Sequence, residues 1–104
     1  MKLRPESLTA VEGGLVGGAE VERLCYTALV HFQQGRFEKA RQLWERALVA
    51  DPRHVKTLSS LGLLHGEQGQ VEQARPLWER ALEVDPDDQE IQSLLASLAD
   101  VRRR

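Results

Sequence analysis

Apolar residues recur along most of this chain at the three- and four-residue spacing of an amphipathic α-helix. The first such stripe begins at Val21, and Gly35 is placed to end the helix, because glycine readily adopts the left-handed conformation that closes a helix C-terminus. A second helix is predicted from Phe37 to the residues before Pro52, since proline disfavours helical geometry in the residue that precedes it. This part of the chain is therefore predicted to form a helical hairpin.

The same pattern returns in the second half of the chain. Helices are predicted over about 55–68 and 71–84, with a turn at Gly69 and a stop before Pro86. Pro76 lies inside the second of these helices, where it removes one backbone hydrogen bond, so a local bend rather than a break is expected. A fifth helix is predicted over 89–101 from a further apolar stripe.

The two hairpins are copies of one another. Residues 21–54 and 55–88 align without a gap as two 34-residue units, and 17 of the 34 paired positions are identical, which is too many for two unrelated helical hairpins. The sequence Leu-Trp-Glu-Arg-Ala-Leu occurs intact in both. A period of this length indicates a repeat architecture, in which the helix 89–101 acts as a cap on the exposed face of the second repeat.

The flanking segments differ from the repeats. Residues 1–20 match neither copy, and four glycines between positions 13 and 18 make a poor helix, so this segment is expected to be flexible or partly helical. Residues 102–104 form a short basic tail. The predicted organisation is thus an N-terminal segment, 1–20, and a repeat domain, 21–104.

The repeats resemble the tetratricopeptide repeat, whose signature places a large residue, a small residue, an alanine, an aromatic and a proline along a 34-residue period. In the second copy this pattern is Leu58, Leu61-Gly62, Ala74, Trp78 and Pro86, and the first copy matches more loosely. The resemblance implies an all-α, right-handed solenoid of two helical hairpins and a capping helix. It also implies a core made by small residues, which allow close helix contacts, together with bulky ones that fill the gaps: Leu24, Ala28, Ala40, Trp44, Ala47, Pro52, Leu58, Leu61, Gly62, Ala74, Trp78, Ala81 and Pro86.

Composition narrows the function classes. A net charge of −2 argues against a dedicated nucleic-acid-binding protein, because phosphate binding requires a basic surface. No apolar run reaches the roughly 20 residues that cross a bilayer, and no secretory signal precedes the repeats, so no membrane partner and a cytoplasmic location are expected. Cys25 has no partner cysteine in this sequence and is predicted to be a buried small apolar residue.

The sequence offers no catalytic or metal-ligating set. His31 and His65 are equivalent positions of successive repeats without Cys, Asp or Glu at ligand spacing, so hydrogen-bonded core histidines are favoured over a metal site. His54 is interpreted as a loop residue without a defined partner. Neither a nucleophile with its base nor a phosphate-binding loop after a strand is found, and we expect a non-enzymatic protein without cofactors.

By resemblance, the first helices of stacked hairpins line a concave groove that receives a peptide or helix of a partner. The positions beside the packing stripe of these helices are Glu22, Cys25, Leu29, Phe32, Gln33, Lys56, Ser59, Ser60, Leu63 and Glu67. Related domains that bind the acidic C-termini of heat-shock chaperones use Lys, Arg and Asn at groove positions, whereas only Lys56 is basic here. A partner with an apolar segment is therefore favoured.

Three functions remain open. The first is an interaction module that binds a protein segment in its groove. The second is a small chaperone of the type III secretion kind, which shields an apolar segment of its client. The third is a self-assembling unit, since repeat proteins generally need at least three repeats for a continuous core and a second copy would supply the missing layer.

Overall fold

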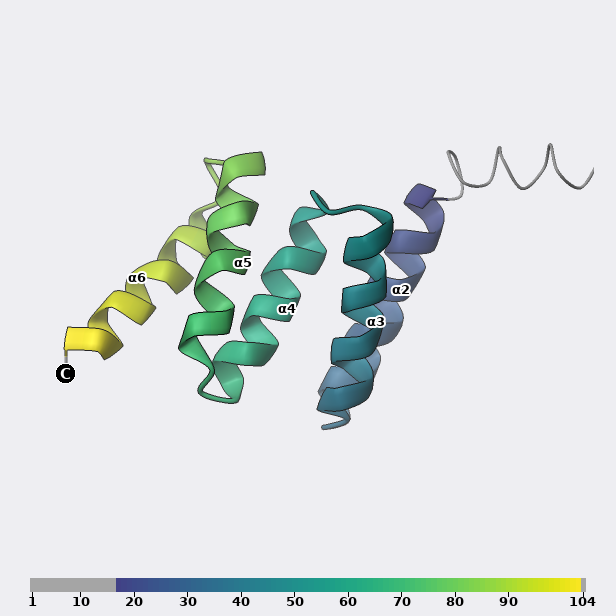
Figure 1. Cartoon of the computed structure of the whole chain (residues 1–104), viewed down its shortest axis with the longest axis horizontal. Helices are drawn as coiled ribbons and strands as arrows, with labels where there is room; N and C mark the ends of the chain where they lie inside the picture. Colours follow the sequence, from purple (N-terminus) through teal and green to yellow (C-terminus); the bar gives the residue numbers. More distant parts are fainter. Residues whose placement is uncertain (1–16, 104) are drawn as a thin grey trace, which may run out of the picture.

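The computed structural model describes the backbone of residues 17–103 and the side chains of residues 18–98. Within this range five helices follow one another without an intervening strand (Figure 1). They are α2 (Gly17–Gln33), α3 (Phe37–Ala50), α4 (Val55–Glu67), α5 (Val71–Val84) and α6 (Gln89–Arg103). The all-α array of helical hairpins predicted from the repeat is confirmed, and α5 runs through Pro76 without interruption.

The two outer helices are longer than predicted. Helix α2 begins at Gly17 rather than Val21, so residues 17–20 of the segment that we expected to be flexible or partly helical are helical. Val21 is only 1% exposed, and a helix fixed by such packing extends cooperatively into residues of weak helical propensity. Helix α6 likewise continues to Arg103, two residues beyond the predicted cap. The rest of the predicted N-terminal segment, residues 1–16, and residue 104 of the predicted basic tail lie outside the described residues.

Both hairpins turn at a glycine in the left-handed region. Gly35 has φ 78° and Gly69 has φ 76°, a conformation that strains residues with a β-carbon. In each turn the next amide reaches back to a histidine carbonyl, with Arg36 N donating to His31 O at 2.9 Å and Gln70 N donating to His65 O at 2.8 Å. These bonds satisfy carbonyls that the end of a helix would leave unpaired.

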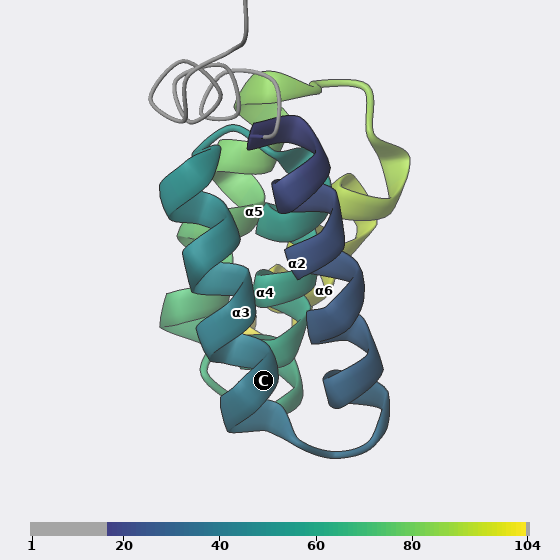
Figure 2. The same ribbon diagram turned by 90° about the vertical axis from the view of Figure 1, so that its right-hand side faces the viewer.

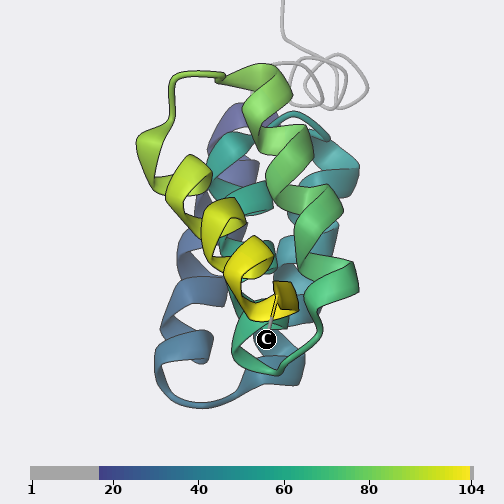
Figure 3. The same ribbon diagram turned by 90° about the vertical axis from the view of Figure 1, so that its left-hand side faces the viewer.

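The helices form two layers. Helices α2, α4 and α6 lie on one side of the molecule, and α3 and α5 lie on the other (Figures 2 and 3). Helix α2 packs mainly against α3 and α4 mainly against α5, while α3 against α4 and α5 against α6 join successive units. The first helices of both repeats and the capping helix therefore share one face of the molecule.

The core divides into two clusters, each built around one tryptophan. Trp44 is 1% exposed and packs among residues of α2, α3 and α4, whereas Trp78 is 2% exposed and packs among residues of α4, α5 and α6. Ile91 and Leu98 of α6 complete the second cluster, so the capping helix covers the second repeat.

The residues expected in the core are buried with two exceptions. Pro52 and Pro86 are exposed, contrary to the expectation that they belong to the core. Both prolines lie in loops, directly after Asp51 and Asp85, the C-cap residues of α3 and α5. Their contribution is to stop a helix, because proline disfavours helical geometry in the residue before it, and this requires no burial.

Gly62 allows a close approach between α4 and the Trp78 side chain of α5. A β-carbon at this position would lie 2.4 Å from Nε1 of Trp78, far inside van der Waals contact. The indole Nε1 instead donates a hydrogen bond to the Ser59 carbonyl at 3.1 Å. In the first repeat, where Ala28 stands at the equivalent position, Trp44 Nε1 is buried and has no hydrogen-bond partner among the described residues.

Candidate functional site

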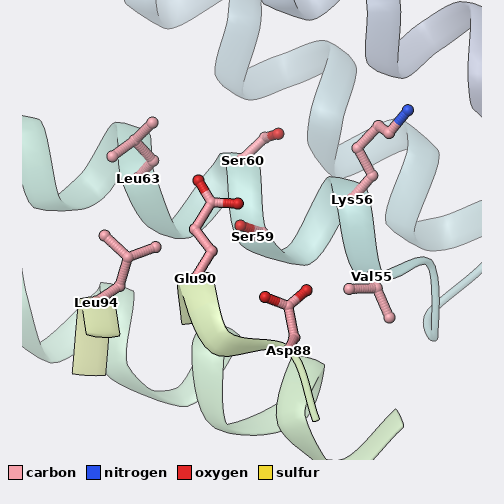
Figure 4. A pocket seen from close by; sticks show the side chains of 8 residues that line it. All are labelled: Val55, Lys56, Ser59, Ser60, Leu63, Asp88, Glu90 and Leu94. Atoms are coloured by element: carbon pink, nitrogen blue, oxygen red, sulfur yellow. The ribbon is translucent and has the colours of Figure 1, made fainter. Parts of the chain in front are cut away.

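Two hollows lie on the face shared by α2, α4 and α6. The smaller one, of about 180 Å³, lies between α2 and α4 and is lined by Glu22, Cys25, Tyr26, Leu29, Lys56 and Ser60. The larger one, of about 460 Å³, lies between α4 and α6 (Figure 4) and is lined by Val55, Lys56, Ser59, Ser60, Leu63, Asp88, Glu90 and Leu94. Because Lys56 and Ser60 line both, the hollows are adjacent, and we call them together the groove.

Most residues assigned to the groove from the sequence line one of its two hollows. They are Glu22, Cys25, Leu29, Lys56, Ser59, Ser60 and Leu63. Phe32 does not: its ring packs against Phe37 at a centroid distance of 5.4 Å and against Trp44 at 5.8 Å, within the first core cluster. Gln33 and Glu67 are exposed in the last turns of α2 and α4 and line neither hollow.

Cys25 belongs to the core as well as to the groove. It is 3% exposed and packs in the cluster around Trp44, and it contributes to the wall of the smaller hollow. The prediction of a buried small apolar residue agrees with this burial.

The groove also contains residues that sequence reasoning missed. Tyr26, which is 68% exposed, stands 34 residues before Ser60, so the repeat register could have identified it. The same register relates Lys56 to Glu90 and Ser60 to Leu94 of the capping helix. We expected α6 to act only as a cap, and the structure shows that it also forms one wall of the larger hollow.

Each hollow of the groove contains an accessible apolar side chain. Leu29 and Leu63 are each 38% exposed, and together with Tyr26 they are three of the four large apolar side chains that stand exposed among the described residues. The fourth, Val49, lies on α3 in the other layer. Exposed apolar side chains gathered in a concavity are typical of interaction sites.

One end of the groove is organised by His54, which we interpreted from the sequence as a loop residue without a defined partner. His54 does lie in the loop before α4, but it has defined partners. His54 is the N-cap of α4: its Nδ1 accepts a hydrogen bond from Thr57 N at 3.3 Å and lies 2.7 Å from Thr57 Oγ1. Since Nδ1 accepts the amide proton, Nε2 carries the ring proton and donates it to Glu22 Oε2 at 2.8 Å.

This contact joins α2 to the start of α4 and favours the ionised form of Glu22. The hydrogen bond from His54 is the main cause that holds the pKa of the Glu22 carboxyl below its usual value, and the nearby Lys56 lowers this pKa further. Glu22 and Lys56 therefore face one another as opposite charges at the border of the smaller hollow.

The two histidines at equivalent repeat positions have different surroundings. His65 Nδ1 lies 2.6 Å from Gln70 Oε1 at the edge of the hairpin turn, whereas His31 Nδ1 is buried and has no hydrogen-bond partner among the described residues. The expectation of a hydrogen-bonded core histidine is therefore wrong for His31. No group of three or more His, Cys, Asp or Glu in the described part of the chain is arranged to hold a metal ion.

The profile of the tetratricopeptide repeat matches residues 31–98, which include most of both repeats and much of α6. A search of curated proteins found no match to the chain. No helix among the described residues is long and apolar enough to span a membrane.

Proposed function

Because the chain belongs to the tetratricopeptide repeat family, whose members are typically non-enzymatic protein–protein interaction modules, we propose that its groove binds a peptide or helical segment of a partner protein. The observation that carries this proposal is the position of Tyr26, Leu29 and Leu63. These apolar side chains are exposed inside the groove rather than dispersed over the surface.

Burial of these side chains supplies the binding free energy in this proposal. Each apolar side chain that a partner covers removes hydrocarbon surface from water, which is worth about 25 cal/mol per Å². The larger hollow, of about 460 Å³, lies within the range of roughly 300–1,000 Å³ that is usual for ligand pockets. It accommodates side chains of a peptide and not a globular surface, so the partner presents a protruding segment.

The binding unit comprises both repeats and the capping helix, because the groove takes residues from α2, α4 and α6. This supports the assignment of residues 21–104 as the interaction domain. The segment bound there carries apolar residues, as the exposed leucines of the groove require.

Paired substitutions test the proposal. The groove variant carries Leu29→Gln and Leu63→Gln, which replace the two exposed leucines of the groove by polar residues that also form helices well. The control is Val49→Gln, which changes a residue that is 84% exposed in the other layer. Proteins captured from a lysate are identified for wild type and both variants, and each candidate segment is then titrated by calorimetry. We expect segments that bind wild type and Val49→Gln but lose at least about tenfold in affinity for the groove variant, which corresponds to about 1.4 kcal/mol.

The same experiment can overturn the proposal. If every titrated segment binds the folded groove variant as tightly as it binds wild type, the groove is not the binding surface. Light scattering after size exclusion provides a second check, because a wild-type oligomer that the groove variant reduces to a monomer would assign the groove to a second copy of the chain.

A further inference from the structure

The larger hollow of the groove has two chemically different ends. Leu63 of α4 and Leu94 of α6 face one another at one end, while Asp88 and Glu90, at the start of α6, direct their carboxylates toward α4 (Figure 4). On the α4 side the hollow is lined by Ser59 and Ser60, and Lys56 is the basic residue of its wall. The hollow therefore combines an apolar end with an acidic one.

Among the described residues, no cation pairs with the acidic end of the hollow. None of the ion pairs formed by the described residues includes Asp88 or Glu90. Lys56 is the basic residue of the hollow, and its side chain points away from the two carboxylates (Figure 4). Its charge acts on Glu22, across the smaller hollow. Asp88 accepts a hydrogen bond from the Ile91 amide, but neither carboxylate forms an ion pair with a described residue, so both can pair with a basic group of a ligand.

A ligand that fills this hollow has to cover the carboxylates as well as the leucines. An entirely apolar segment would remove the carboxylates from water without giving them a partner, and such burial of an unpaired charge is strongly unfavourable. An acidic segment would add repulsion between like charges. A segment with a basic side chain close to its apolar residue satisfies both ends, because it packs between the leucines and pairs with the acids.

We propose that the hollow between α4 and α6 selects partner segments in which an apolar residue is accompanied by a neighbouring Arg or Lys, with the apolar side chain between Leu63 and Leu94 and the basic group at Glu90 and Asp88. This inference rests on the proposed function of the groove. It defines the charge of the partner, which the exposed leucines leave open.

The probe is a library of random peptides displayed on phage and selected on the full chain. Selected sequences are expected to contain Arg or Lys next to or near a large apolar residue. A selected peptide is then synthesised in two forms, one of them with its basic residue replaced by glutamine, and both are titrated by fluorescence anisotropy. Raising the salt concentration should weaken only the basic form appreciably, because salt screens charge pairs.

The protein variants form a matched pair. Glu90→Gln removes one negative charge from the hollow, and Glu83→Gln removes one from the exposed surface of α5, which lines neither hollow. We expect Glu90→Gln to weaken binding of the basic peptide about two- to fivefold, the usual size of an accessible ion pair, and to leave the glutamine form unchanged. In the structure the Ile91 amide donates a hydrogen bond to Asp88 Oδ1 at 3.0 Å, and Asp88→Asn keeps a side-chain oxygen that can accept it. Adding Asp88→Asn to Glu90→Gln should therefore weaken binding of the basic peptide further.

The outcomes separate this inference from the proposed function. Selected peptides that are apolar without a basic residue, or a basic peptide that Glu90→Gln and Glu83→Gln weaken equally, would overturn the inference while leaving the groove as a binding site. Selected peptides whose affinity is unchanged in the folded Leu29→Gln and Leu63→Gln variant would overturn the proposed function itself.

Discussion

Replacement of Gly62 by alanine should destabilise the protein even though alanine is the better helix former. Gly62 lies within α4, where the intrinsic preference favours alanine by about 1 kcal/mol. The added methyl group would, however, lie 2.4 Å from Nε1, 2.7 Å from Cδ1 and 2.8 Å from Cε2 of Trp78. Because the atoms met are the rigid indole of a buried residue, the ring or a helix has to move.

The magnitude follows from what this movement disrupts. Overpacking a well-filled core costs about 1–3 kcal/mol. Displacement of the indole also weakens its hydrogen bond to the Ser59 carbonyl, which is worth about 0.5–1.5 kcal/mol. After subtraction of the helical gain of about 1 kcal/mol, the net loss is about 0.5–3.5 kcal/mol. For a domain of this size such a loss lowers Tm by about 2–28 °C.

Gly66 provides the control, because it lies one turn further along α4 and faces the same indole. A β-carbon at Gly66 would lie 3.5 Å from Cη2 of Trp78, an ordinary van der Waals contact. Gly66→Ala should therefore keep or raise the stability, by up to about 1 kcal/mol. The two substitutions are chemically identical and are expected to differ in sign.

The stability of both variants is measured by thermal and urea unfolding, monitored by far-UV circular dichroism. Tryptophan fluorescence reports whether the surroundings of the indole change. Combining Gly62→Ala with Trp78→Phe tests the cause, because the smaller ring relieves the clash and the double variant should lose less than the sum of the single losses. A Gly62→Ala protein as stable as Gly66→Ala would refute the close contact between α4 and α5.

Two further predictions concern individual hydrogen bonds. Trp78→Phe should destabilise the fold more than Trp44→Phe, by about 0.5–1.5 kcal/mol in urea unfolding. The reason is that the Trp78 indole donates a hydrogen bond, whereas the Trp44 indole has no partner among the described residues; equal losses would contradict this. Glu22, whose pKa the hydrogen bond from His54 lowers in the folded state, stabilises the fold above its usual pKa of 4.5 and loses this contribution as the pH falls through its lower folded-state value. The Tm advantage of wild type over Glu22→Gln should therefore shrink below pH 4.5, and an advantage that stays constant under acid titration would exclude the contact.

The sequence was sufficient to predict the helices and their order. Glycine at the hairpin turns, proline after each second helix and the spacing of apolar residues are local signals, and they act on the few residues around them. For this reason the bounds of α3, α4 and α5 agree with prediction to within one residue. The ends of α2 and α6 differ, because there the packing of neighbouring residues extends a helix beyond its local signals.

Much of the groove could also be predicted, because the 34-residue register assigns equivalent positions of α2 and α4 to one face. Phe32 was wrongly assigned to the groove. It lies at the border between the groove face and the core face of α2, and its ring packs against the rings of Phe37 and Trp44. Tyr26 was missed although its register matches that of Ser60.

What the sequence by itself determined is therefore the scaffold: two copied hairpins, their turns and the small and large residues that pack between them. Only the tertiary structure decided that His54 caps α4 while bonding Glu22, 32 residues earlier, and that the capping helix forms a wall of the groove. The reason is physical. Periodicity fixes which residues share one face of a helix, but the rotation and distance between helices depend on the packing of all of them together, and these set which distant side chains meet.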